Sequence, residues 1–544
     1  MLALAGAAAA PAILRSLEYP HADPKLLRAA PSSEHGPPPR YFSQKRDHFD
    51  ASDTSTWQQA YYVNDTYFDG TGPVFLCVGG EGPPLSGASV SHSVHCNNAV
   101  EWLSEKKALM FAVEHRVPQL VSRYPTAHST LAALPLFLVS LVWSFAHPHA
   151  TAPRSPPQYY GCHNASACPY APTDPMPLKW LSSRQALADL AAFHAHATAE
   201  FKLDAKRNKW VSFGGSYPGM LAGWFRVLYP ELVHASVSSS APVVAKVEMK
   251  EYNDIAARAY SLASVGGSAE CRAAIADGHA AIGRMMNTSD GRSDLVKLFP
   301  IVASRGADWL RERAGRLEFA GGGVAYFPSQ GNNPACTSSD CNIERICKTM
   351  TTGHAPRDNV ANLAKVAKHL DLSSSPLLAS PPPSPSPSPS PSPRRVRGTH
   401  NSLDYWGYQT CTEFGFYQTC DLGSGCFYTQ GLNLLNDMDA FCMADYGISR
   451  PEIAASVARS NAFYGADRPD LAHNASRIMY VNGDVDPWSG LSILRSPSDG
   501  LPTLLVPGAS HHAWTHPTYP TDQPSVVKAR ALIRQQVEAW LGEP

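Results

Sequence analysis

Three short apolar runs with strand-like composition stand out along the chain, and each leads into a turn-forming segment. Residues 209–213 alternate and carry aromatic and branched side chains, as a buried strand does. Residues 477–481 and 502–506 have a similar character and also end at turn-forming residues. Residues 220–226 continue as an apolar run that is compatible with a helix. The pattern predicts a strand followed directly by a helix at 209–226, and two further core strands near the C-terminus.

The turn between the predicted strand and helix carries a serine, Ser216, among small residues. The sequence over residues 213–219 is Phe-Gly-Gly-Ser-Tyr-Pro-Gly. On such a sharp turn a serine hydroxyl is exposed for attack, and the next backbone N–H points at the developing oxyanion. The motif departs from Gly-x-Ser-x-Gly, because Pro218 stands two residues after the serine and Gly219 three. A glycine-rich turn that serves packing alone is the competing interpretation.

An acid and a histidine follow the two later strands, in the order that a catalytic triad needs. Asp484 and Asp486 lie in the turn after the strand at 477–481, and His511 and His512 follow the strand at 502–506. A nucleophilic serine requires a base, and the base requires a carboxylate to hold its tautomer. The order Ser216, Asp486, His511 is that of α/β-hydrolases, and a β-α-β step fits the interval between acid and histidine. A turn acid and a surface histidine are the alternatives.

Further motifs resemble those of one peptidase family. They are Gly-Gly-Glu-Gly-Pro at 79–83, Glu-His-Arg at 114–116, Leu-Ser-Ser-Arg-Gln-Ala-Leu-Ala-Asp-Leu at 181–190 and Tyr-Trp-Gly-Tyr-Gln-Thr-Cys at 405–411. With the segment 57–64 and the triad order, they resemble the S28 family of serine peptidases, which contains prolyl carboxypeptidases and dipeptidyl peptidases. With interruptions, the resemblance covers about residues 40–544. It implies an α/β-hydrolase fold with an inserted helical, disulfide-tied cap, and no metal or organic cofactor.

The histidine block departs from the prolyl carboxypeptidase pattern, since it is His-His-Ala-Trp rather than His-His-Leu-Asp-Leu. We align the first histidine, His511, with the family base and keep His512 as the alternative. The chain is most similar to the thymus-specific branch of the family.

The position of the triad predicts the organisation of the chain. Because a hydrolase sheet needs only a few tens of residues between elbow and acid, most of the interval is expected to form the cap, at 246–470. Helix-like stretches within it are 252–264, 270–286 and 360–370. The hydrolase core is then 40–245 and 471–544, after an N-terminal tail or partial signal segment at 1–39. A cap over the site favours chain ends as substrates.

Two segments fit neither the core nor the cap. Residues 380–397 are rich in serine and proline and end in arginines, which predicts an extended, solvated loop. Residues 117–158 separate Glu-His-Arg from Tyr-Tyr-Gly, which the family would join, and we interpret this segment as an insertion: a retained intron or a true loop. Its apolar stretch is shorter than the about 20 residues that a membrane helix needs, so we predict no membrane span.

Composition points to a secreted, lysosomal or vacuolar protein. Twelve cysteines without a Cys-x-x-Cys motif favour disulfides over a zinc or redox site. Four sequons permit N-glycosylation, at Asn64, Asn164, Asn287 and Asn474. A formal net charge of −1 gives no sign of a nucleic-acid partner.

The remaining site residues follow from the chemistry of acyl transfer. Two donors are needed for an oxyanion hole, and we expect them from Tyr217 and from Gly80 and Glu81 in the glycine-rich loop. A tight structural turn is the alternative for that loop. Family resemblance implies that Trp488 lines an apolar pocket suited to proline, although a core tryptophan is nearly as reasonable. His511, His512 and His516 lack acidic or cysteine companions at a metal-site spacing, so we predict no metal.

These observations predict a serine exopeptidase that acts on peptides next to proline, either as a carboxypeptidase or as a dipeptidyl peptidase. An esterase or lipase with the same triad is one alternative. A binding protein that keeps the fold without activity is another. Peptides are the expected partners, and the sequence leaves open whether the chain forms a homodimer.

Overall fold

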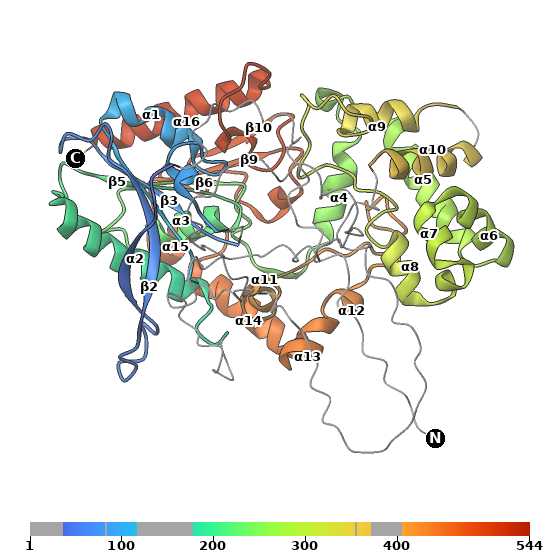
Figure 1. Ribbon diagram of the computed structural model, residues 1–544, viewed down its shortest axis with the longest axis horizontal. Helices are drawn as coiled ribbons and strands as arrows, with labels where there is room; N and C mark the ends of the chain where they lie inside the picture. Colours follow the sequence, from blue (N-terminus) through green and yellow to red (C-terminus); the bar gives the residue numbers. More distant parts are fainter. Residues whose placement is uncertain (1–35, 82–83, 117–177, 354–355, 371–404, 544) are drawn as a thin grey trace, which may run out of the picture.

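The structure, a computed structural model, describes residues 36–81, 84–116, 178–353, 356–370 and 405–543 (Figure 1). The predicted insertion at 117–158, the Ser/Pro-rich segment at 380–397 and the sequon at Asn164 lie outside these ranges, as does almost all of the N-terminal segment 1–39.

Eight strands of the described residues form one mixed sheet in the order β1-β2-β4-β3-β5-β6-β9-β10. β1, β2 and β4 pair antiparallel, and all the other pairs are parallel. The strands are β1 (Arg40–Lys45), β2 (Thr56–Asn64), β3 (Val74–Val78), β4 (Leu109–Val113), β5 (Trp210–Gly215), β6 (Ala235–Ser239), β9 (Ile478–Gly483) and β10 (Thr503–Val506). This order, with a sharp turn after β5, is that of the α/β-hydrolase fold, and the predicted fold class is confirmed.

The sheet explains why its central strands are apolar without interruption. Every residue of β3, β4, β5, β6 and β9 is buried, because helices cover both faces of the parallel part. α1 (Asn97–Lys106) and α16 (Pro524–Gly542) pack on one face, whereas α2 (Ser183–Phe201) and α3 (Tyr217–Leu228) pack on the other (Figure 1).

The connection between β9 and β10 differs from the β-α-β step expected there. It contains the short 3-10 helix η9 (Pro487–Leu491) and no α-helix. Asp486 caps η9 by accepting a hydrogen bond from the backbone N–H of Trp488, 3.0 Å away. The acid is therefore held at the start of a helical turn directly after its strand.

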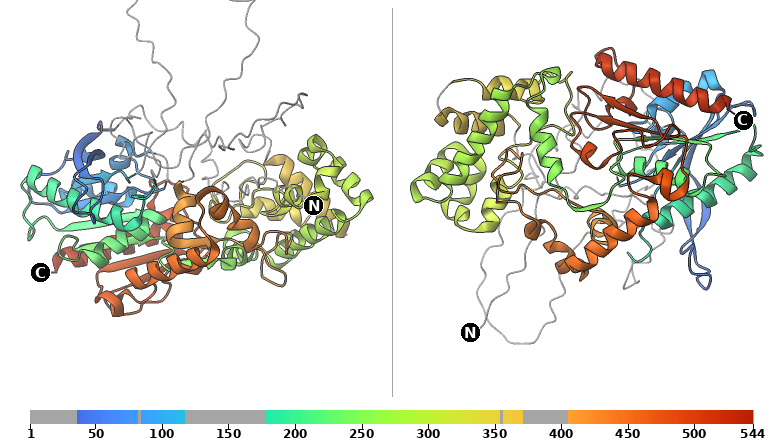
Figure 2. Two further views of the ribbon diagram at one scale, coloured as in Figure 1. Left: turned by 90° about the horizontal axis from the view of Figure 1, so that it is seen from below. Right: turned by 180° about the vertical axis from the view of Figure 1, so that it is seen from behind.

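A helical region beside the sheet has a hydrophobic core of its own (Figure 2). Its helices are α4 (Lys250–Ala259), α5 (Ala269–Met285), α6 (Ser289–Leu298), α7 (Pro300–Arg305), α8 (Arg313–Ala320), α9 (Ile343–Met350) and α10 (Pro356–His369). They include helices at the three predicted positions, although α4 ends earlier than expected, because Tyr260 begins a turn that leads into the 3-10 helix η5 (Ala263–Val265).

Residues 405–464 pack differently from the helices before them. They form α11 (Tyr405–Gln409), the π-helical turn η8 (Thr410–Phe414), α12 (Leu435–Met438), α13 (Ala440–Tyr446) and α14 (Arg450–Tyr464). Most of their buried apolar side chains belong to the same hydrophobic cluster as α2 and α3, whereas Phe427 and Leu432 belong to that of the helical region. The ring of Tyr464 stacks on that of Trp224 at 3.7 Å. β8 (Gly415–Tyr417) pairs with β7 (Lys246–Glu248). The interval predicted as one cap thus contributes to two hydrophobic clusters.

Disulfides connect the non-sheet regions more than the sheet. Ten cysteines of the described residues form five bridges, and no described cysteine is free. The pairs are Cys77–Cys96, Cys271–Cys347, Cys336–Cys341, Cys411–Cys442 and Cys420–Cys426. Four of the five therefore lie between residues 271 and 442, where regular β-structure is sparse.

We expect reduction to destabilise the protein, and the helical region most of all. Chain entropy gives about 4 kcal/mol for the bridge between Cys271 and Cys347, which are 76 residues apart. It gives about 2 kcal/mol for Cys336 and Cys341, which are 5 residues apart. Replacing each pair with alanines and measuring the free energy of unfolding in denaturant tests this ranking. Equal losses would contradict it, and twelve free thiols in the native protein would contradict the expected oxidising compartment as well.

The three described sequons differ in accessibility. Asn287 and Asn474 are exposed, whereas Asn64 is half-buried and its Nδ2 donates to the backbone oxygen of Val90 over 2.9 Å. The first two are thus better placed for glycosylation, which attaches to that nitrogen. None of the helices in the described ranges is long and apolar enough to cross a membrane.

Candidate active site

Ser216 lies between the end of β5 and the start of α3, in a strained backbone conformation. Its φ is 64° and its ψ is −132°, which is costly for a residue with a side chain. The backbone N–H of Ser216 donates to the oxygen of Ser239 on β6, and its carbonyl accepts from Met220 in α3, both over 3.0 Å. Strand and helix thus hold the turn from both sides, as in a nucleophile elbow.

Pro218 stands where the Gly-x-Ser-x-Gly motif has its second glycine, and the positions at which a side chain would clash are different ones. A Cβ atom on Gly214 would lie 2.2 Å from the oxygen of Pro218, and one on Gly219 would lie 2.7 Å from the oxygen of Ser239. Pro218 itself packs against Gly80, where a Cβ would lie 2.4 Å from the proline ring. Glycine is therefore needed at positions 214 and 219, and the lack of a side chain at Gly80 leaves space for the ring of Pro218.

Asp486 and His511 form a buried pair, and the residue after His511, His512, packs against Gly215 of the elbow. Nδ1 of His511 lies 2.8 Å from Oδ2 of Asp486, and the exposed fractions of the two residues are 5% and 0%. The second carboxylate oxygen accepts the N–H of Trp488. The other ring nitrogen, Nε2 of His511, is buried and has no hydrogen-bond partner among the residues that the structure describes. A histidine held in this way by a carboxylate can accept a proton at Nε2.

The two alternative residues are engaged elsewhere. Asp484 is half-buried, and its Oδ1 accepts the N–H of Gly508 over 2.6 Å. Nδ1 of His512 lies 3.1 Å from Oγ1 of Thr515. The His512 ring packs against Gly215, where a Cβ would lie 2.9 Å from it. The geometry therefore favours Asp486 and His511 as the acid and base.

A cluster of buried histidines surrounds His512. The rings of His95 and His516 lie 5.2 Å and 5.6 Å from that of His512, and burial lowers the pKa of both to about 4. The three are uncharged near neutral pH. Within the described ranges, no group of three or more histidine, cysteine or acidic side chains is arranged to hold a metal ion.

The glycine-rich loop after β3 lies against the elbow. The N–H of Gly79 donates to the oxygen of Val113, so this donor serves the loop itself. The carboxyl group of Glu81 interacts with the Ser216 hydroxyl, the Tyr217 N–H and His511, all of which lower its pKa. Burial outweighs them and raises the pKa of Glu81 to about 7. The predicted oxyanion region thus contains an acidic side chain whose role the sequence did not indicate.

Comparisons with known proteins identify the family of the chain. A sequence model of serine carboxypeptidase S28 matches residues 44–118 and 158–533, which is most of the chain. The chain belongs to the serine carboxypeptidase S28 family. Residues 119–157, which the family model leaves unmatched, fall inside the segment predicted as an insertion. This S28 protein is a serine peptidase, and the resemblance drawn from its motifs is confirmed.

Similar proteins cover nearly the whole S28 chain. The human thymus-specific serine protease is 29% identical over 526 residues, with 95% of this chain and 89% of the relative covered. The mouse protein of that name is 30% identical, covering 92% and 87%. Bovine lysosomal Pro-X carboxypeptidase is 23% identical, covering 93% and 88%. A crystal structure of a proline iminopeptidase from Mycobacterium smegmatis has a TM-score of 0.32 at 11% identity, covering 92% of this chain and 99% of that chain.

Trp488 of the S28 peptidase lies in an aromatic environment next to His511. Its ring centroid is 5.3 Å from that of Tyr252, 5.5 Å from that of Phe416 and 6.4 Å from that of His511. Only 4% of the residue is exposed. The ring is therefore packed like a core tryptophan and lies next to His511, and its contact with substrate stays a prediction.

Two of the family-like motifs contact the residue after the serine, and a third is linked to them through Glu413. Nε2 of His115 lies 3.1 Å from the hydroxyl oxygen of Tyr217, and Nε2 of Gln409 donates to the same oxygen over 3.0 Å. Gln409 also donates to the carboxylate of Glu413, which accepts the backbone N–H and the hydroxyl of Ser183. Residues that are distant in sequence thus fix the side chain of Tyr217, the residue that follows Ser216.

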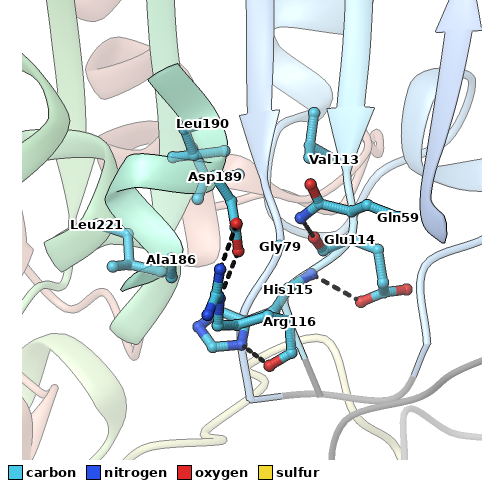
Figure 3. Close-up of a pocket in the computed structure, with 11 residues that line it drawn as sticks. Gln59, Gly79, Val113, Glu114, His115, Arg116, Ala186, Asp189, Leu190 and Leu221 are labelled. Atoms are coloured by element: carbon cyan, nitrogen blue, oxygen red, sulfur yellow. Dashed lines mark hydrogen bonds and ion pairs between the residues drawn. The ribbon is translucent and has the colours of Figure 1, made fainter. Parts of the chain in front are cut away.

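A buried ion pair supports the same region. Arg116 binds the carboxylate of Asp189 through two nitrogens (Figure 3). Nε2 of His48 also lies 2.8 Å from that carboxylate. The ring of His115 contacts the backbone oxygen of Arg116. These contacts give the Glu-His-Arg motif and the motif at 181–190 a structural role that their sequence alone did not reveal.

We expect Glu81 to limit activity at high pH. Its carboxyl group, with a pKa of about 7, is neutral in acid and gains a negative charge as the pH rises, next to the predicted oxyanion position. An added anion there opposes the transition state, so kcat/KM should fall about tenfold above that pKa, a loss of about 1.4 kcal/mol. In Glu81→Gln, which stays neutral, the alkaline decline should disappear from the pH profile of peptide hydrolysis. An unchanged decline would refute this role.

Proposed function

We propose that this S28 peptidase is an exopeptidase that cleaves peptides next to proline through an acyl-enzyme. The contact that carries the proposal is the 2.8 Å pair between His511 and Asp486, formed beside a serine on a strained turn. This combination supports a Ser-His-Asp mechanism.

In the proposed reaction, the Ser216 oxygen attacks the scissile carbonyl carbon and its proton passes to Nε2 of His511. Asp486 holds the ring with Nδ1 protonated and stabilises the charged imidazolium. The imidazolium then gives its proton to the departing amine as the C–N bond breaks, which leaves an ester on Ser216. A water molecule, deprotonated by His511, cleaves that ester and restores the serine.

The negative oxygen of each tetrahedral intermediate needs hydrogen-bond donors. The N–H of Tyr217 is one proposed donor, and the backbone of Gly80 and Glu81 is the proposed source of the second. The contact of Gly80 with Pro218 supports this assignment, because it holds the loop directly on the elbow.

Specificity for proline is supported by the aromatic surroundings of the site. Trp488 lies next to His511 and Phe416 packs against Trp488, and flat apolar rings of this kind suit the pyrrolidine ring. Among the relatives, bovine and human proteins are named lysosomal Pro-X carboxypeptidases. The helical region and residues 405–464 stand beside the sheet, and we infer that they restrict access to chain ends.

Two measurements test the proposal. A fluorophosphonate probe should label wild-type protein and not a Ser216 variant; absence of labelling would indicate a protein without catalytic activity. Mass spectrometry of one proline-containing peptide, blocked at either end in turn, then gives the polarity. Cleavage that requires a free C-terminus indicates a carboxypeptidase, and cleavage that requires a free N-terminus indicates a dipeptidyl peptidase. Turnover of esters with no cleavage of either peptide would replace the proposal with an esterase.

We further propose a secreted or lysosomal location. Five disulfides among the described cysteines require an oxidising compartment to form. Secretion or lysosomal targeting provides that environment. Fractionation of cells that express the full-length protein tests it, and recovery in the cytosolic fraction would contradict it.

A further inference from the structure

A short segment of the helical region, Ser329 to Asn332, crosses both loops that carry the catalytic pair. The hydroxyl of Ser329 donates to the backbone oxygen of Val485, the residue before Asp486, over 2.7 Å. The backbone N–H of His511 donates to the backbone oxygen of Gln330 over 3.1 Å. The hydroxyl of Ser510 donates to the oxygen of Asn332 over 2.9 Å. One segment thus fixes the acid loop and the histidine loop together.

The side chain of Gln330 in this segment is also held in one orientation. Its Oε1 accepts hydrogen bonds from Nε1 of Trp488, 3.0 Å away, and from the hydroxyl of Tyr252, 2.8 Å away. An indole N–H can only donate, so the amide oxygen must face Trp488 and the amide nitrogen must face elsewhere. That nitrogen has no hydrogen-bond partner in the part of the chain that the structure describes, and Gln330 is half-exposed.

Gln330 therefore has two properties that bear on the site of His511 and Asp486. It fixes the indole ring of Trp488, which lies 6.4 Å from the His511 ring, and it retains an amide N–H₂ that can still donate. The acceptors in a peptide that match such a donor are main-chain carbonyl oxygens and the terminal carboxylate. A hydrogen-bonding group in a site discriminates strongly against substrates that lack its partner, because it is then left unpaired.

We propose that Gln330 is a specificity-determining residue of this site, which positions Trp488 through its amide oxygen and binds an oxygen of the peptide main chain or C-terminus through its amide nitrogen. The inference rests on the proposed function, since it concerns how the same site selects peptides. It assigns to the helical region a direct role in substrate binding in addition to restricting access.

Gln330→Glu is the most direct test. Glutamate keeps an oxygen for Trp488 and Tyr252 and replaces the donating N–H₂ with an acceptor. Hydrolysis of a proline-containing peptide should then lose at least about tenfold in kcat/KM, mainly through a higher KM. Hydrolysis of a small aryl acetate, which has neither a peptide main chain nor a terminal carboxylate, should be unchanged, as should fluorophosphonate labelling. Gln535→Glu, the same change on the exposed face of α16, is the matched control.

The comparison of peptide and ester hydrolysis separates a role in substrate binding from a role in folding. Equal losses with peptide and ester would mean that Gln330 only supports the fold of the site, and no loss with either would mean that it does not bind substrate. Both results overturn the inference while labelling of wild-type Ser216 still supports the proposed function. Absence of labelling and turnover in the wild type would overturn the function itself. Gln330→Met, of similar length and without charge, repeats the peptide and ester comparison if the glutamate variant folds poorly.

Discussion

Replacing Ser216 with alanine is expected to abolish peptide hydrolysis, with a loss of about a millionfold in kcat. Removal of the nucleophile from a Ser-His-Asp triad costs about this much, and the residual rate comes from binding and the oxyanion donors. The variant should also lose fluorophosphonate labelling. Folding should be unaffected, because the backbone contacts of residue 216 with Ser239 and Met220 do not involve its side chain.

Ser212→Ala is the matched control for this variant. Ser212 lies on the same strand, and its hydroxyl donates to the backbone oxygen of Ala222 over 3.0 Å. Its loss should lower the free energy of unfolding by about 1 kcal/mol and leave kcat unchanged. If Ser216→Ala kept substantial activity while remaining folded, the assignment of the nucleophile would be wrong.

Asp486→Asn is expected to lower kcat by about ten-thousandfold, the effect known for the corresponding change in a serine protease triad. An asparagine amide can donate to Nδ1 of His511, which would place the ring proton on Nε2 and prevent that nitrogen from accepting a proton. The pH profile and kcat of peptide hydrolysis report the effect. Thermal unfolding shows whether the buried pair has been lost for structural reasons alone.

Asp484→Asn is the comparison that makes this test specific. Asp484 belongs to the same turn and its Oδ1 accepts the N–H of Gly508, so its replacement by asparagine should change kcat and stability little. An asparagine oxygen can replace the carboxylate as acceptor there. A greater loss of kcat in Asp484→Asn than in Asp486→Asn would show that the acid has been assigned to the wrong residue.

The side chain of Tyr217 is held by residues that are distant from it in the sequence. Tyr217 supplies a proposed oxyanion donor through its backbone, and its side chain is fixed by His115 and Gln409, more than 100 residues before it and after it. Burial raises the pKa of Glu413, which completes the contact to Gln409. A substitution at any of these positions can therefore affect the site without touching substrate.

The sequence alone determined the features that depend on neighbouring residues. Strand and turn patterns at 209–219 predicted β5 and the strained turn at Ser216, because a buried strand followed by small residues is a local signal. The order of serine, acid and histidine, with the motifs at 79–83 and 114–116, was sufficient to predict the α/β-hydrolase fold and the S28 family, both of which are confirmed.

Only the tertiary structure decided the features that depend on which distant segments meet. It showed that Gly80 accommodates Pro218, that His511 rather than His512 contacts Asp486, and that Gln330 reaches Trp488. It also divided the interval 246–470 between two hydrophobic clusters. Contacts between separate segments, which here lie 25 to 158 positions apart, leave no periodicity in the sequence, because their energy depends on packing that forms only when the whole chain has folded.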